Sequence, residues 1–191
     1  MIINGTKLLL AGPIKNMLGT KETNGIVSHG LTESGYDIRI KQTIEYWPAG
    51  YETKVLSCEM LDHQGRLKQP MIRTYYSEEE NTLYPYREDY NTNFVLASSI
   101  EEFDMPDHLM GQVLNKSTWA RKGLDSSMTT NIEPGWKGFL TLELVFHSNS
   151  PVTIPAGSGI AQVIFHELSE KRSYSGKYQN QSDNPVEAIS Q

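Results

Sequence analysis

Residues 115–124 (NKSTWARKGL) bring two hydroxyl groups and three cationic side chains into one short stretch. Ser117 is typical of a helix cap and Gly123 of a helix stop, so a short helix is expected between them. Backbone N–H groups and the helix dipole at such a start favour a bound phosphate. The same composition also fits an ordinary capped surface helix. A Walker loop is excluded because the Gly-x-x-x-x-Gly-Lys pattern is absent.

Two carboxylates follow about ten residues later, around a Pro-Gly turn in residues 129–144 (TTNIEPGWKGFLTLEL). Glu143 stands between Leu142 and Leu144, so strand alternation places it on the face opposite these leucines, either in solvent or in a pocket. Most strand glutamates are solvated. A desolvated glutamate has a raised pKa and can transfer protons near neutral pH.

The elements that would position these groups are mainly short alternating strands separated by turn residues, which predicts a closed or sandwich-like barrel. Residues 117–123 are the one clear helix, whereas residues 5–10 fit either a strand or a short helix. The expected strands are residues 36–40, 43–47, 94–97, 138–146, 152–154 and 160–165. The length of 191 residues and the lack of an internal linker predict a single domain over residues 1–191.

Composition excludes several partners. The net charge is −6, with 23 acidic against 17 basic residues, so no general field attracts a nucleic-acid backbone, although a few local cations can bind a small anion. No apolar run approaches the roughly 20 residues that span a bilayer, and no leader is recognisable, so we expect a cytoplasmic protein without a membrane partner.

Zinc chemistry is disfavoured by the residue count. Cys58 is the one cysteine, which excludes an intrachain disulfide and every multi-cysteine zinc site. The five histidines have no metal-binding spacing and are expected at the surface or in loops.

Several ordered motifs together resemble the dCTP deaminase family, which belongs to the same superfamily as the trimeric dUTPases. The resemblance covers roughly residues 34–181. Its most specific parts are residues 116–124 (KSTWARKGL), 132–138 (IEPGWKG) and 141–144 (TLEL). Supporting matches are residues 36–39 (YDIR), Pro106, residues 159–162 (GIAQ), Phe165 and residues 176–181 (GKYQNQ).

The resemblance implies a mainly β fold, a distorted β-barrel or β-clip of the dUTPase-like type with one short helix after the phosphate-binding turn. It also implies a homotrimer with active sites shared between subunits. Glu143 would be the general acid and base, helped by Arg121 and Ser117, and the backbone near Thr129 and Thr130 would read the pyrimidine edge. The triphosphate, bound with Mg²⁺ and without a direct protein ligand to the metal, would be held by Lys116, Ser117, Thr118, Tyr174, Lys177 and Gln181.

The implied reaction is hydrolytic deamination of dCTP to dUTP and ammonia, which supplies deoxyuridine nucleotide for dTTP synthesis. One buried carboxyl can deprotonate water, protonate N3 and protonate the departing amine. The zinc-dependent alternative needs a His or Cys ligand beside a Cys-x-x-Cys pair, which one cysteine cannot build. The tail, about residues 169–191, is polar enough to be either a disordered terminus or a mobile lid over the triphosphate.

The sequence departs from the family pattern at Glu133, where members usually carry Asp near the deoxyribose. The longer side chain weakens the alternatives of a dUTPase or a bifunctional deaminase and diphosphatase, because a displacement of about an ångström can cost roughly a hundredfold in rate. A non-catalytic nucleotide-binding regulator would be expected to lack some of the catalytic groups. Tyr36 and Trp136 are candidates for packing at the 2′ carbon. Residues 48–90 match little and predict an insertion, which suits a viral or distant member.

Overall fold

The computed structural model describes residues 1–23, 26–46, 57–61, 67–68, 74–77, 82–85 and 93–189. Its largest sheet has the strand order β13-β11-β16-β4-β3-β2, with β1 paired to β16, and β10, β14 and β12 form a second sheet. The bounds in these two sheets are β1 Ile2–Ile3, β2 Lys21–Glu22, β3 His29–Leu31, β4 Tyr36–Arg39, β10 Phe94–Asp104, β11 Leu109–Asn115, β12 Leu124–Asp125, β13 Asn131–Ile132, β14 Lys137–Phe146 and β16 Gly159–Glu167.

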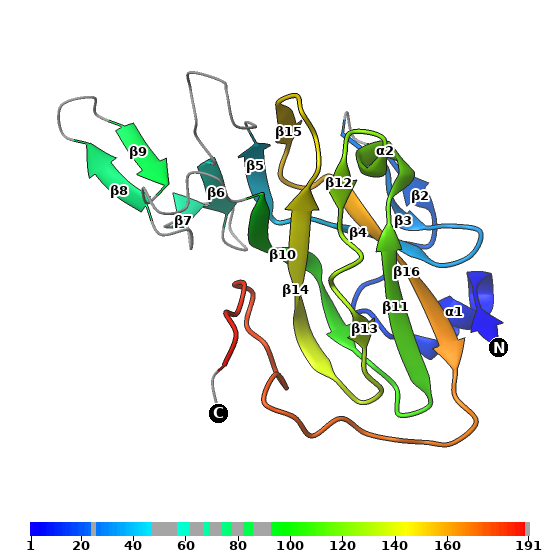
Figure 1. The fold of residues 1–191 in the computed structure, drawn as a ribbon. Helices are drawn as coiled ribbons and strands as arrows, with labels where there is room; N and C mark the ends of the chain where they lie inside the picture. Colours follow the sequence, from blue (N-terminus) through cyan, green and yellow to red (C-terminus); the bar gives the residue numbers. More distant parts are fainter. Residues whose placement is uncertain are drawn as a thin grey trace.

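Two smaller sheets extend the β structure, with the order β15-β5-β6-β7 in one and the pair β8-β9 in the other. Their bounds are β5 Gln42–Tyr46, β6 Ser57–Leu61, β7 Leu67–Lys68, β8 Thr74–Ser77, β9 Thr82–Pro85 and β15 Val152–Ile154. The β8-β9 hairpin lies away from the two main sheets (Figure 1). The predicted strand end at Trp47 lies outside the described residues, as does most of the predicted insertion.

The core lies between the two main sheets because their strands alternate buried and exposed positions. On β14, Leu142, Leu144 and Phe146 are buried while Glu143 is only partly buried. The ring of Phe146 stacks on Tyr46 of β5 with centroids 4.4 Å apart, which joins the small sheet to the core. The mainly β fold predicted from the sequence is confirmed. The described strands form separate sheets, none of which closes on itself, so the closed-barrel alternative is not seen.

The helices differ from the expectation of one helix. Residues 5–10 were expected to be either a strand or a short helix, and the structure has helix α1 at Gly5–Ala11. The helix ends at Gly12, which has a left-handed φ of 59°. Helix α2 spans only Ser117–Ala120, and its cap position is Lys116, so the predicted cap role of Ser117 is wrong. No helix within the described residues is long and apolar enough to cross a membrane.

Strand β10 is much longer than the predicted residues 94–97, because it continues through a bulge between Ser98 and Glu102. The hydroxyl of Ser99 stabilises this irregular part: it donates to the Glu101 carbonyl at 2.8 Å and accepts the Leu140 N–H at 2.9 Å. Such a bulge lets a polar stretch continue in a strand without strict alternation. The residue pattern after Ala97 therefore did not predict that the strand continues to Asp104.

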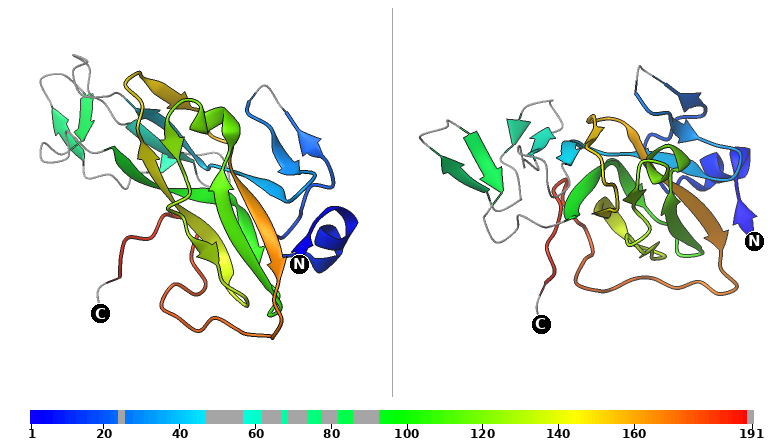
Figure 2. Two further views of the ribbon diagram at one scale, coloured as in Figure 1. Left: turned by 45° about the vertical axis from the view of Figure 1, so that its right-hand side comes forward. Right: turned by 45° about the horizontal axis from the view of Figure 1, so that its top comes forward.

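The chain after β16 passes below the ends of β11 and β14 and then rises beside β14 (Figures 1 and 2). Backbone bonds attach it there: Asn180 donates to the Lys137 carbonyl at 2.9 Å, and Phe139 donates to the Gln181 carbonyl at 3.1 Å. Gly138 forms a parallel bridge with Gln181. The tail is thus paired with the first residues of β14. Its mobility in the free protein stays a prediction.

Gly138→Ala should release the tail from β14. At Gly138, φ is +129° and an added Cβ would lie 2.5 Å from the Gln181 nitrogen, a backbone atom that must move. Gly157→Ala is the matched control, since its φ of +81° brings similar strain but its nearest neighbour is a side-chain carbon of Ile26 at 3.4 Å. Hydrogen exchange of the Phe139 amide should accelerate in the first variant and not in the control. Equal protection in both would contradict this docking of the tail.

Candidate active site

A cavity of about 670 Å³ lies between β14, the loop before β13 and the tail. Residues from β10, β13, β14 and the C-terminal segment form its walls, so parts of the chain far apart in sequence meet there. The lining residues are Phe94, Leu96, Thr129, Thr130, Asn131, Ile132, Glu133, Trp136, Leu140, Thr141, Glu143, Tyr174, Tyr178, Gln181, Val186, Glu187 and Ala188.

Glu143 lies in the wall of this cavity, on the face of β14 opposite the buried leucines. Its cross-strand partner on β10 is Leu96, which lines the same cavity. Burial raises the pKa of Glu143 above the ordinary value of 4.5. Its carboxylate makes no ion pair or hydrogen bond with the described residues. The pocket alternative for Glu143 is confirmed, and its role as general acid and base stays a prediction.

The loop before β13 is held beside Glu143 by side-chain bonds. The hydroxyl of Thr129 accepts the Glu143 backbone N–H at 2.6 Å. Farther back, the side-chain oxygen of Asn115 accepts the Ser126 N–H at 2.6 Å. Thr129 is buried, and Thr130 is an exposed residue of the cavity wall. The predicted pair of threonines therefore lies at the base of the site, with the Thr129 hydroxyl engaged in holding the strand.

The Pro-Gly turn places Glu133 and Trp136 at the same cavity. Trp136 donates its backbone N–H to the Glu133 carbonyl at 3.2 Å, and Gly135 between them has a φ of +72°. The Trp136 ring is buried, and its indole N–H donates to the Tyr178 carbonyl at 2.7 Å. Glu133 is exposed. Trp136 thus fastens the tail, a role that the motif alone did not indicate.

The tail residues divide into two groups. Tyr174 and Gln181 line the cavity, and the Gln181 side-chain oxygen accepts the Thr141 hydroxyl at 3.1 Å. Lys177 does not line it: its ammonium bonds to the Ile189 carbonyl and lies 5.3 Å from the ring centroid of Tyr178. The binding roles of these three residues stay predictions.

The residues of the predicted phosphate turn do not line this cavity. Lys116 is buried and forms an ion pair with Asp37 of β4. Ser117, Thr118 and Arg121 are exposed, and their side chains have no hydrogen bond or ion pair to the described residues. One chain therefore carries the two halves of the predicted site on separate surfaces.

The cavity has an unbalanced charge. Among the described residues that line it, Glu133, Glu143 and Glu187 carry carboxylates and none carries a cation. Within the described part of the chain, no group of His, Cys, Asp and Glu side chains is placed to hold a metal ion. A polyphosphate in this cavity would need positive charge from elsewhere.

Several residues that line the cavity were not predicted from the sequence. Leu96 lies in the predicted strand at residues 94–97, where alternation gives its face but not its pairing with Glu143. Val186, Glu187 and Ala188 had no signal, since they follow the last recognised motif and reach the cavity only through the course of the tail. The other apolar lining residues not anticipated are Phe94, Ile132 and Leu140.

A family model described as dCTP deaminase-like matches residues 18–168, and the chain belongs to this family. It is 32% identical over 161 residues to a dCTP deaminase of Protochlamydia amoebophila, covering 82% of this chain and 78% of that one. It is 34% identical over 176 residues to a dCTP deaminase of Roseiflexus castenholzii, covering 90% of this chain and 88% of that one. The resemblance seen in the motifs is confirmed.

The solved structure of a 2′-deoxycytidine 5′-triphosphate deaminase from Agrobacterium tumefaciens is also similar to this chain. The sequence identity is 16% and the TM-score 0.48, over 87% of this chain and 47% of that chain.

Glu143→Gln should change how stability depends on pH. Since burial raises the pKa of Glu143 in the folded protein, the folded state holds that proton more tightly than the unfolded chain. This contribution to stability is fully present below the unfolded pKa and is lost as pH rises through the folded pKa. The variant should therefore gain stability relative to wild type across that window. Thermal unfolding between about pH 4 and 8 measures it, and a pH-independent difference would contradict desolvation of Glu143.

Proposed function

We propose that this protein is a hydrolase that converts dCTP to dUTP and ammonia without zinc. The observation that carries the proposal is Glu143, a partly desolvated carboxyl with a raised pKa that faces the cavity from the strand TLEL. Membership in the dCTP deaminase-like family and relatives named dCTP deaminase support this substrate over dUTP.

Glu143 can perform all the proton transfers of this reaction. As a carboxylate it takes a proton from water while the water oxygen bonds to C4 of cytosine, and it passes that proton to N3. It then takes the proton of the new hydroxyl and gives it to the amine, whereupon the C4–N bond breaks and ammonia leaves. The carboxylate ends in its starting state, so no second base is required.

The apolar surroundings support this cycle. Leu96 beside Glu143 and Leu140 in the same cavity limit access of bulk water, which keeps the carboxyl pKa raised. A carboxyl with a raised pKa is better matched to proton transfer near neutral pH in both directions. The loop at Thr129 and Thr130, fixed to β14 beside Glu143, offers backbone groups to the pyrimidine edge.

We propose further that the protein is a homotrimer in which one subunit's cavity receives the phosphate turn of its neighbour. Among the described residues, the charged groups that line the cavity are all carboxylates, while Ser117, Thr118 and Arg121 lie exposed on another surface. Joining the two surfaces would bring the Arg121 guanidinium to the triphosphate and to the Glu143 site. Mg²⁺ bound to the triphosphate would reduce the remaining negative charge next to Glu133 and Glu143.

Incubation of the protein with dCTP and Mg²⁺ tests the reaction, with ammonia and pyrophosphate measured separately. Glu143→Gln should lower the rate of ammonia release by about 10² to 10⁴ and leave dCTP binding largely intact, because the amide keeps the shape but cannot exchange protons. Retention of more than about a tenth of the rate would exclude this role. Release of pyrophosphate from dUTP would favour the diphosphatase alternative.

Mixing two inactive variants tests the shared site. In trimers that assemble randomly from Glu143→Gln and Arg121→Lys chains, about a quarter of the interfaces combine an intact Glu143 with an intact Arg121. Arg121→Lys should be inactive alone, because a point charge cannot replace a planar fork of donors. Co-expressed variants should then recover roughly a quarter of the wild-type rate. Absence of recovery in verified mixed trimers would place both residues in the site of one subunit, or Arg121 outside the site.

A further inference from the structure

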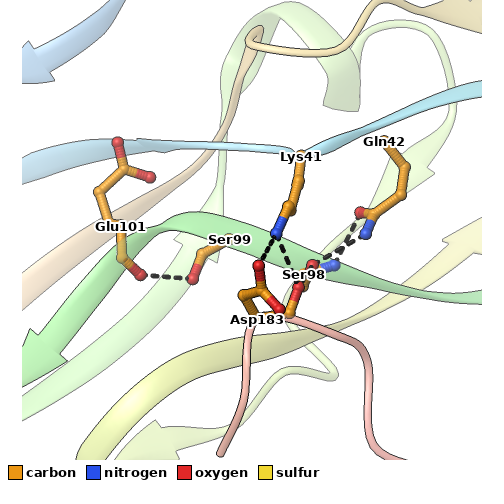
Figure 3. A network of polar contacts seen from close by, with 6 residues as sticks. All are labelled: Lys41, Gln42, Ser98, Ser99, Glu101 and Asp183. Carbon is orange, nitrogen blue, oxygen red and sulfur yellow. Dashed lines mark hydrogen bonds and ion pairs between the residues drawn. The ribbon is translucent and has the colours of Figure 1, made fainter. Parts of the chain in front are cut away.

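A buried lysine outside the predicted site holds the C-terminal segment. Lys41 lies just before β5 and is 7% exposed. Its ammonium donates to the carboxylate of Asp183 at 2.5 Å and to the carbonyl of the same residue at 3.1 Å. Figure 3 shows these two side chains meeting beside Ser98. The hydroxyl of Ser98 also donates to the Asp183 carbonyl, at 3.2 Å.

The sheet side of this contact is rigid. Ser98 is fully buried, and its hydroxyl and N–H bond to the side chain of Gln42, each at 2.8 Å (Figure 3). The backbone N–H of Lys41 donates to the Ser98 carbonyl at 2.9 Å. Lys41 and Ser98 are therefore fixed to each other through the main chain. The tail is the part that is held.

The Lys41–Asp183 ion pair is largely shielded from solvent, so removal of one partner should destabilise the contact. A buried ammonium needs a compensating charge, so loss of the Asp183 carboxylate would leave the buried Lys41 ammonium poorly solvated. The side chains of Lys41 and Asp183 are 7% and 20% exposed, whereas those of the surface pair Lys15–Glu102 are 50% and 38% exposed. Exposed pairs contribute little. The two pairs thus form a natural comparison.

The anchor lies close to Glu143 along the strands. Ser98 pairs with Thr141, and the next pair on the same face is Leu96 with Glu143, a spacing of about 7 Å along the strand. The Thr141 hydroxyl accepts the N–H of Val186 at 3.0 Å. With Asp183 at Ser98 and Val186 at Thr141, the tail continues as the cavity wall at Glu187 and Ala188.

We propose that Lys41 is a positioning residue for the nucleotide site: its ion pair with Asp183 fixes residues 183–188 as one wall of the cavity that contains Glu143. The effect on catalysis rests on the proposed function, whereas the anchoring does not. In the proposed mechanism this wall lines the cavity but takes no part in the proton transfers. Loss of the anchor should therefore weaken dCTP binding more than it slows the reaction of bound dCTP. The change should appear in KM rather than in kcat.

Three variants test the anchor. Lys41→Met keeps the apolar stem and removes the charge, and Asp183→Asn alters only the tail and so leaves the sheets intact. The double variant removes both charges and retains the bond from the Ser98 hydroxyl to the backbone of residue 183. Lys15→Met is the matched control on the surface. The readouts are hydrogen exchange of the backbone amides in residues 183–188 other than Pro185, and KM and kcat for dCTP.

Each single variant should raise amide exchange in residues 183–188 and raise KM on the order of tenfold, with kcat within about twofold. The double variant should recover part of both, because neither member of the ion pair keeps its charge. Lys15→Met should change neither. Unchanged exchange in both single variants overturns the anchor, and faster exchange with unchanged KM overturns its role at the site. A wild-type protein inactive on dCTP would refute the proposed function, while the exchange data would still decide the anchor.

Discussion

The pairing of β10 with β14 is the constraint on which the site depends. In this register Ala97 faces Leu142 on the core side, and Leu96 faces Glu143 on the cavity side. A slip of one residue would turn Glu143 into the core and Leu142 toward the cavity, since successive strand residues point to opposite faces. The buried leucines of β14 therefore fix the position of the Glu143 carboxyl, because the register that packs the core also turns this carboxyl toward the cavity.

The same strand face combines two opposed environments. Glu143 faces the apolar Leu96 across the ladder, and burial raises its pKa. Two residues earlier, Thr141 and Ser98 are polar and bind the tail through hydroxyl groups. One face of this short ladder therefore both surrounds a carboxyl with a raised pKa and binds the C-terminal segment beside it. Within the described part of a single chain, the cavity wall carries no cation, since Arg121 is exposed on another surface and Lys116 is paired to Asp37.

Much of this arrangement was readable in the sequence, because alternation is local. Residues 152–154 and 138–146 were predicted within one residue of the observed strands. Alternation also placed Glu143 on the face opposite its leucines, but it left open whether that face meets solvent or a pocket. Contacts between distant residues were not readable. Nothing near Lys41 indicates that residue 183 will neutralise it, and nothing near Lys116 indicates burial against Asp37. Ion pairs across the fold leave no periodic trace, so their positions had to come from the structure.

The parallel bridge between Gly138 and Gln181 has a consequence for solubility. Strand β12 covers only the last residues of β14, pairing with Val145 and Phe146. The tail covers the first residues on that strand, where Phe139 donates to Gln181 and Lys137 accepts from Asn180. Without it, this stretch would present unpaired backbone groups as a template for strands of other chains. The C-terminal segment therefore also guards an open sheet edge against aggregation.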